Sequence, residues 1–160
     1  MFIINPYIFG KNWQLQTGNL VYMTANNAPS PYVATSNATL NVGSPYNTFD
    51  STSSSESRVD YGSGVLATKM MWTTPIRIVQ GIARVYRSGQ TSTAFRVYGI
   101  KEDDSAVLIY SGTHTSDTDV TYTSTDQNTE FVGIRLEVDR RVDLIVSTRN
   151  CRITQWYEMV

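Results

Sequence analysis

Residues 131–139, FVGIRLEVD, constrain the fold of this chain most, because apolar side chains occupy every second position. The apolar positions are Val132, Ile134, Leu136 and Val138. A period of two predicts a β-strand that buries one face. Residues two apart share a face of a strand, so we expect Glu137 and Asp139 to point together toward water.

Other short runs rich in β-branched and aromatic residues predict further strands, all of the clear ones after residue 74. They cover 75–87, 94–101, 106–111, 142–148 and 151–159. Polar turn segments separate them, at 87–90, 101–105, 111–117, 126–130 and 148–150. The hydrophobic periodicity of an amphipathic helix is missing from the sequence. Short strands with such turns are typical of an all-β antiparallel sandwich or barrel.

The composition is that of a globular protein that does not depend on charge for binding. Hydrophobic residues make up 41% of the 160 positions and charged residues 17%, and the net charge is -1. The scattered basic residues argue against a nucleic-acid or anionic-membrane partner. The single cysteine, Cys151, excludes an internal disulfide.

The first 20 residues differ from the rest, which we assign to one sandwich domain over 21–160. The opening MFIINPYIFG is too short to span a membrane and lacks the marks of a signal peptide, so we expect no membrane insertion. It is either an edge strand or an anchor that docks on a partner chain. The docking residues would be Phe2, Ile3, Ile4, Tyr7, Ile8 and Phe9.

From residue 31 on, the order of several motifs is informative. PYVATSNATL is followed by SPYNTFD, a polar loop, MMWTTPIRIVQGIARVY, FRVYGIKEDDSAVLIYSG, FVGIRLEV and a terminal RITQWYE. This order resembles the discoidin or coagulation factor C-type domain of the galactose-binding-like superfamily. The resemblance implies a jelly-roll β-sandwich of about eight strands. It also implies sugar or surface binding through loops at one end, without enzymatic activity.

The segment SPYNTFDSTSSSES, 44–57, carries the Phe-Asp pair of that resemblance as Phe49 and Asp50. We expect Tyr46 and Phe49 to plug the sandwich and the serine run to project as a loop. In the family a calcium-binding turn often follows, and Asp50 and Glu158 would match two calcium ligands. Calcium takes six to eight oxygens, and this chain replaces the rest of the turn. The alternative is that Asp50 caps a turn and Glu158 is a solvated strand residue; no other cofactor is expected.

A sugar site needs an aromatic face and planar polar groups, and the residues around the serine run provide both. The predicted ligand-binding residues are Tyr46, Arg58, Asp60, Tyr61, Arg87 and Gln90. The alternative is that Tyr46 and Tyr61 pack inward under the stem of Arg58.

Catalytic motifs are missing from the sequence. The only histidine, His114, has Ser116 and Asp117 as neighbours, and we expect it to be an exposed loop residue and not a base. Cys151 has no partner motif for zinc or for nucleophilic catalysis. We therefore expect no enzymatic activity.

The residues INPYIFG also look like the N-termini of some tailed-phage virion proteins. The first hypothesis is a virion structural protein: a homo-oligomeric jelly-roll subunit of a tail, baseplate or capsid that docks on other virion proteins and is located in the virion. The alternative is a carbohydrate-binding module that recognises cell-surface glycans.

Overall fold

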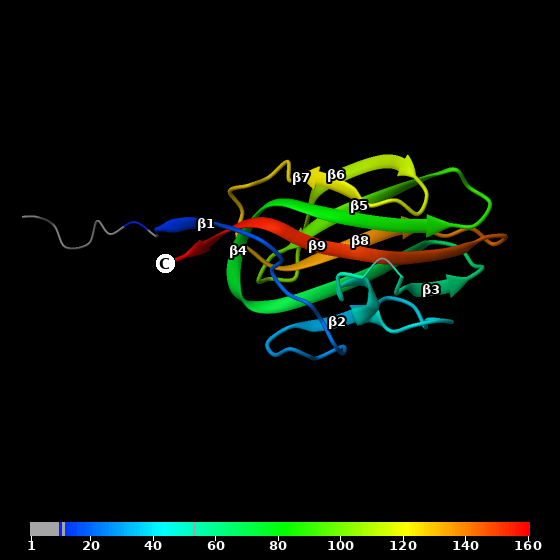
Figure 1. Ribbon diagram of the computed structural model, residues 1–160, viewed down its shortest axis with the longest axis horizontal. Helices are drawn as coiled ribbons and strands as arrows, with labels where there is room; N and C mark the ends of the chain where they lie inside the picture. The colour runs from blue at the N-terminus through cyan, green and yellow to red at the C-terminus, as the bar shows by residue number, and fades with distance from the viewer. Residues whose placement is uncertain (1–9, 11, 53) are drawn as a thin grey trace, which may run out of the picture.

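Strand β4 (Val65–Arg87) organises the computed structural model, which describes residues 10, 12–52 and 54–160. The first part of β4 pairs with β2 and β8, and the second part pairs with β7 and β9. The pairing with β8 shifts register between Met71 and Ile76. Figure 1 shows β4 curving there, at the end near the C-terminus, and running back along the other side. One strand therefore contributes to both layers of the sandwich.

The remaining strands complete the two layers by antiparallel pairing. They are β1 (Trp13–Thr17), β2 (Val33–Ser36), β3 (Ser57–Asp60), β5 (Ser92–Ile100), β6 (Ala106–Thr115), β7 (Val120–Thr123), β8 (Phe131–Asp139) and β9 (Ile145–Met159). One layer holds β2, the first part of β4, β8, β5 and β6. The other holds β1 and β3 along one edge of β9, then the second part of β4 and β7. The described residues thus form a 9-stranded sheet folded on itself, which confirms the predicted all-β antiparallel sandwich.

The core lies between the layers and follows the alternation seen in the sequence. In β8, Ile134, Leu136 and Val138 have no exposed surface, whereas Arg135 and Glu137 lie on the outer face. Each such buried aliphatic side chain stabilises the fold by about 1.5–3 kcal/mol. Phe49, just after the 3-10 turn η1 (Pro45–Thr48), is also buried, so the predicted plug is confirmed.

A close approach of β5 to Phe131 requires glycine at position 99. A Cβ on Gly99 would lie 2.5 Å from two carbons of the Phe131 ring, well inside van der Waals contact. The ring therefore occupies the space that a side chain on β5 would take.

Several predicted boundaries are wrong: the strand predicted from 142 begins at Ile145. Three further errors have a physical reason. β4 begins at Val65, not at 75, because Thr68 points into the core, where the hydroxyl of Thr148 accepts its hydrogen bond at 3.1 Å. β9 continues through the predicted turn 148–150 because Asn150 is also buried, where its Nδ2 donates a hydrogen bond to Oδ1 of Asp119 at 3.2 Å. β6 extends to Thr115 through its pairing with β5.

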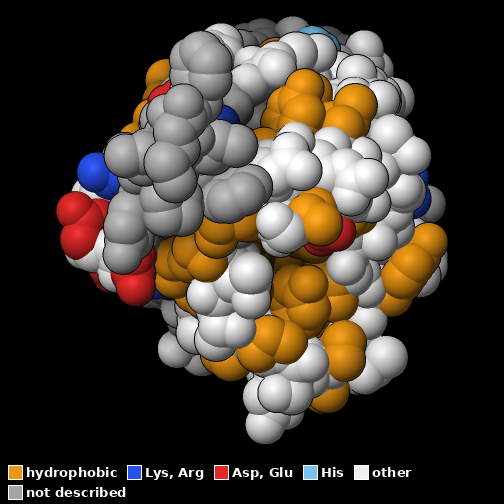
Figure 2. Space-filling view, turned by 90° about the vertical axis from the view of Figure 1, so that its left-hand side faces the viewer, with side chains coloured by type: hydrophobic (Ala, Val, Ile, Leu, Met, Phe, Trp, Pro, Cys, Tyr) orange, Lys and Arg blue, Asp and Glu red, His pale blue; other side chains and the backbone are white. Residues whose placement is uncertain are grey.

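The end of the sandwich that carries β1 and the C-terminus exposes apolar side chains. Met159 pairs with Trp13 and is 44% exposed, and the N–H of Val160 donates to the carbonyl of Asn12. Figure 2 looks at this end and shows hydrophobic side chains gathered over it. The predicted docking residues in 1–9 lie outside the described residues. Within the described part of the chain, no helix is long and apolar enough to cross a membrane.

Candidate functional site

The candidate site lies at the opposite end of the sandwich, where β3, β9 and β4 run side by side. Val146, near the start of β9, pairs with Val59 of β3 on one side and with Arg87 of β4 on the other. The residues that follow β3 therefore emerge beside the turn that follows β4. Figure 1 shows the end of β3, the β4–β5 turn and the β8–β9 turn together, away from the C-terminus.

Tyr61 is the most exposed aromatic residue at this end, and its main chain is held on both sides. Its N–H donates to the carbonyl of Leu144 at 3.1 Å, and its carbonyl accepts a hydrogen bond from Nη2 of Arg140 at 2.7 Å. Its φ of 55° lies in the left-handed region, and the residue is 57% exposed. The ring is thus presented to solvent on a fixed backbone, so the inward packing weighed for Tyr61 is wrong.

Arg58 and Asp60 precede Tyr61 on the outer face of β3 and form an ion pair. Nε of Arg58 lies 2.8 Å from Oδ1 of Asp60, and its Nη1 lies 3.4 Å from Oε1 of Glu56. The N–H of Asp60 donates to Oδ1 of Asn41 at 2.8 Å. Both side chains are largely buried, and the paired atoms Nε of Arg58 and Oδ1 of Asp60 are themselves buried.

Arg87 and Gln90 lie on the neighbouring turn, as predicted, but in different roles. Nη2 of Arg87 donates to the carbonyl of Asp139 at 2.7 Å, which ties the β4–β5 turn to the β8–β9 turn. Gln90 is exposed and its amide donates only to the adjacent Gly89 carbonyl, at 3.3 Å. Tyr46 does not join this end: it lies in η1, partly buried against the core.

The β8–β9 turn adds residues that the sequence reasoning missed. Arg140 supports Tyr61, and Arg141 pairs with Asp143 at 3.2 Å beside it. The run DRRVD, which interrupts two apolar strands, is itself a turn signal in the sequence. Read that way, it would have placed charged side chains at this end of the sheet.

Arg149 holds the end of the serine run against β9. Its Nη2 lies 2.9 Å from Oε2 of Glu56, and its Nη1 lies 2.8 Å from Oδ1 of Asp117. The guanidinium carbon also lies 4.6 Å from the centre of the Tyr86 ring. Ser57, the last residue of the predicted projecting loop, is fully buried in β3. The end of the run is therefore part of the sheet, contrary to the prediction.

Glu137 and Asp139 share the outer face of β8, as expected, but they are paired and not simply solvated. Arg96 of β5 places Nε 3.3 Å from Oε2 of Glu137 and Nη2 2.7 Å from Oδ1 of Asp139. The hydrogen bond from Arg96 is the main cause that lowers the pKa of Asp139, and the charges of Arg96 and Arg87 lower it further. This ion-pair cluster fixes the outer face of β8 and β5.

His114 lies in β6 and not in an exposed loop, so that prediction is wrong. Its Nε2 is hydrogen-bonded to the hydroxyl of Tyr110, and its ring packs against Phe95 at 5.4 Å between centres. The ring nitrogen is thus engaged by a phenol within an aromatic cluster. This arrangement supports packing of β6 on β5.

The two predicted calcium ligands have separate surroundings. Oδ1 of Asp50 accepts hydrogen bonds from the N–H and hydroxyl of Thr52, at 2.9 and 2.8 Å, as in the turn-capping alternative. Glu158 lies near the end of β9 between Gln14 and Ile76. Among residues 10, 12–52 and 54–160, no group of three or more His, Cys, Asp or Glu side chains is arranged to hold a metal ion. Calcium binding stays a prediction.

Comparison with known proteins relates this fold to carbohydrate-binding modules. No protein-family model and no curated protein matches the chain. Solved structures do match: the CBM32 module of AlyQ in complex with 4,5-unsaturated mannuronic acid has a TM-score of 0.59 and 21% identity, over 76% of this chain and 92% of that one. The family 32 module of C. perfringens NanJ in complex with galactose has a TM-score of 0.59 and 14% identity, over 79% and 93%. The fold is the galactose-binding-like β-sandwich.

A third match is a pectin-binding module, with a TM-score of 0.59 and 13% identity, over 76% of this chain and 88% of that one. The chain also covers 34% of a truncated AlyQ that holds CBM32 and alginate lyase domains, at a TM-score of 0.58. In that structure the CBM32 domain shares a chain with alginate lyase domains.

Proposed function

We propose that this chain is a non-catalytic carbohydrate-binding module that recognises glycans through the end of the sandwich around Tyr61. The observation that carries the proposal is that Tyr61 as a residue is 57% exposed while both polar groups of its main chain are hydrogen-bonded within the protein. An exposed ring on a fixed backbone loses little conformational entropy when a ligand covers it.

The groups around the ring fit a sugar. The electron-rich face of tyrosine attracts the C–H face of a pyranose, and planar amide, guanidinium and carboxylate groups bind its hydroxyls. Asp60 and Arg58 of β3 and Gln90 of the neighbouring β4–β5 turn supply such groups. The carbohydrate-binding modules with the same fold lend support, since two of them are described with bound sugars.

The other sequence-based hypothesis was a virion structural protein. None of the matching structures named above is described as a virion protein, so the virion location, the virion partners and the homo-oligomer stay predictions. The glycan hypothesis receives the support of both the fold comparison and the exposed Tyr61.

A glycan array followed by calorimetric titration tests the proposal. Tyr61→Ala is expected to weaken binding about tenfold or more, because truncating an aromatic anchor at a binding surface costs at least ~1–2 kcal/mol. Tyr22→Ala is the matched control, since Tyr22 is 61% exposed on the segment between β1 and β2. Wild-type protein that binds no glycan, or equal binding by the two variants, would overturn the proposal.

A further inference from the structure

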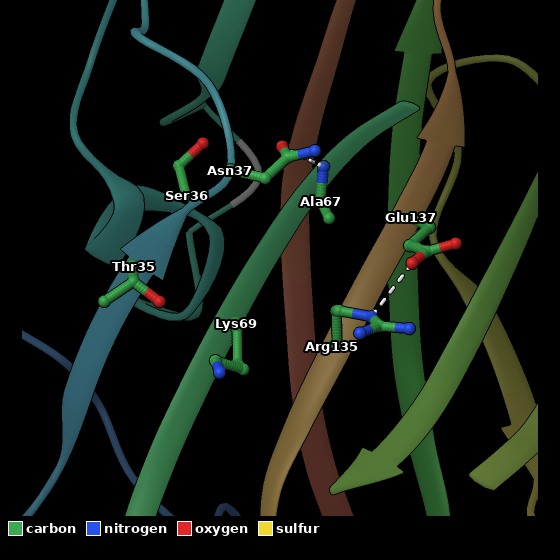
Figure 3. A pocket seen from close by; sticks show the side chains of 7 residues that line it. All are labelled: Thr35, Ser36, Asn37, Ala67, Lys69, Arg135 and Glu137. Atoms are coloured by element: carbon green, nitrogen blue, oxygen red, sulfur yellow. Dashed lines mark hydrogen bonds and ion pairs between the residues drawn. The ribbon is translucent and has the colours of Figure 1, made fainter. Parts of the chain in front are cut away.

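A groove of about 360 Å³ lies on the outer face of the other layer, across β2, β4 and β8. Two rows of paired residues form it: Thr35, Lys69 and Arg135 in one, and Asn37, Ala67 and Glu137 in the next. Figure 3 shows these side chains around the hollow, with Lys69 and Arg135 on neighbouring strands. This groove is separate from the end that carries Tyr61.

The hollow exists because a small residue sits between long ones. Ala67 has only a methyl group, whereas its neighbours on β8 and along β4 are Glu137 and Lys69. Asn37 closes one side: its Nδ2 donates to the carbonyl of Val65 and its Oδ1 accepts from the N–H of Ala67, each at 2.8 Å. These two hydrogen bonds to the main chain of β4 hold the Asn37 side chain in place, so this side of the groove is preformed.

Arg135 is held in the groove with its outer nitrogens unused. Its Nε lies 2.9 Å from Oε1 of Glu137, and its guanidinium carbon lies 4.5 Å from the centre of the Tyr98 ring. The other oxygen of Glu137 is engaged by Arg96 at 3.3 Å. Within the described residues, Nη1 and Nη2 of Arg135 make no hydrogen bond, and this planar pair matches the two oxygens of a carboxylate.

Lys69 provides a second cation that a ligand can recruit. Its Nζ lies 3.1 Å from Oδ1 of Asp104, but the Asp104 side chain is 73% exposed. An ion pair this exposed contributes little to stability, so exchange of Asp104 for a ligand carboxylate costs little. Once Asp104 is exchanged, the lining carries Lys69 and Arg135 against one carboxylate, Glu137, which leaves a single positive charge for a singly charged anion.

We propose that this groove binds the carboxylate of a uronic acid residue within an acidic polysaccharide. Arg135 would bind the carboxylate with its outer nitrogens, Lys69 would add charge, and the hydroxyl of the exposed Thr35 would reach the ring hydroxyls. The proposal rests on the proposed function for its ligand class and adds a second, acid-specific site to it.

The test uses a de-esterified galacturonate hexamer and, as a matched neutral ligand, the fully methyl-esterified hexamer. Arg135→Gln is expected to weaken binding of the acidic hexamer about tenfold, because a bidentate charge-assisted contact is lost. Lys69→Gln is expected to have a smaller effect in the same direction. Asp104→Asn should strengthen binding several-fold by removing the competitor, and asparagine tolerates the left-handed φ of 63° found there.

Lys101→Gln is the matched control, since Lys101 pairs with Asp103 at 3.8 Å outside the groove. Melting temperatures equal to wild type would show that the variants fold. Equal affinity for the acidic and esterified hexamers would overturn the proposal for the groove. So would an equal loss of acidic-hexamer binding in Lys101→Gln and Arg135→Gln.

Tyr61→Ala separates the two proposals. If Tyr61→Ala loses affinity for the acidic hexamer and Arg135→Gln keeps it, the proposal for the groove is overturned and the Tyr61 site is supported. Loss in Arg135→Gln, with no glycan lost in Tyr61→Ala, would support the groove and overturn the Tyr61 site.

Discussion

The hydroxyl of Thr48 in η1 lies 2.8 Å from the hydroxyl of Thr148 in β9, and neither residue has any exposed surface. The hydroxyls of Ser57 and Thr68 join them at 2.8 and 3.1 Å, and Ser57 also donates to the carbonyl of Ser44 at 2.8 Å. This buried network joins β3, β4 and β9 to the segment that begins the serine run. It holds η1 against the sheet.

Replacing Thr48 by valine should destabilise the fold. The change keeps the volume but removes the hydrogen bonds of Thr48 with the buried hydroxyls of Ser57 and Thr148, which costs about 1–3 kcal/mol. Chemical denaturation measures the loss. Thr113→Val, at an exposed strand position in β6, should change the free energy of unfolding much less, and equal effects would contradict the importance of the network.

Adding a methyl group at position 99 should also destabilise the fold. In Gly99→Ala the new Cβ meets the Phe131 ring, and overpacking of this kind costs about 1–3 kcal/mol. The double variant Gly99→Ala with Phe131→Leu should recover part of that loss, because leucine lacks the clashing ring atoms. A double-mutant cycle without coupling would show that the contact is not the cause.

The thiol of Cys151 should resist modification in the folded protein. Burial raises its pKa to about 12, so the reactive thiolate is scarce at neutral pH. A chromogenic disulfide reagent is expected to label the thiol only after denaturant is added. Complete labelling of the native protein within minutes would contradict the buried position.

Asp139 should contribute to stability above its ordinary pKa and lose that contribution in acid. Its pKa is lowered from 3.8 in the fold, chiefly by the hydrogen bond from Arg96. A lowered pKa favours the folded state above 3.8, and the gain is lost as the pH falls through the folded-state pKa. The melting temperature of Asp139→Asn should therefore decrease less steeply with falling pH than that of wild type.

The control for that experiment is Asp143→Asn on the same turn, where the pair with Arg141 is exposed. Its acid dependence should follow wild type. If Asp139→Asn does so too, the Arg96 contact does not govern the acid response.

Freeing the main chain of Tyr61 should weaken glycan binding without unfolding the protein. Arg140→Met removes the hydrogen bond to the Tyr61 carbonyl, so ordering the ring on binding should cost about threefold in affinity. Arg141→Met, on the adjacent exposed residue, is the control. Equal titration results for the two variants would show that Arg140 does not position Tyr61.

Several features of the fold follow from local pattern. The alternation in 131–139 predicts both the strand and its buried face, and Phe49 is buried as its aromatic-proline context indicates. Arg58, Asp60, Tyr61, Arg87 and Gln90 were predicted to gather at one end, and the pairing of β3 and β4 on either side of β9 brings them there. Short-range periodicity suffices for the strand at 131–139 because its side chains alternate between core and solvent.

What the sequence determined by itself was the class of fold, through the period-two pattern and the turn residues between strands. The tertiary structure alone decided that β4 continues through both layers, that Thr68 faces inward to Thr148, and that Arg140 supports Tyr61. The tertiary structure also decided the groove around Ala67, since the groove needs β2 and β8 on either side of β4. Each of these depends on contacts between residues far apart in the chain, whose polar groups find partners only after the layers have packed.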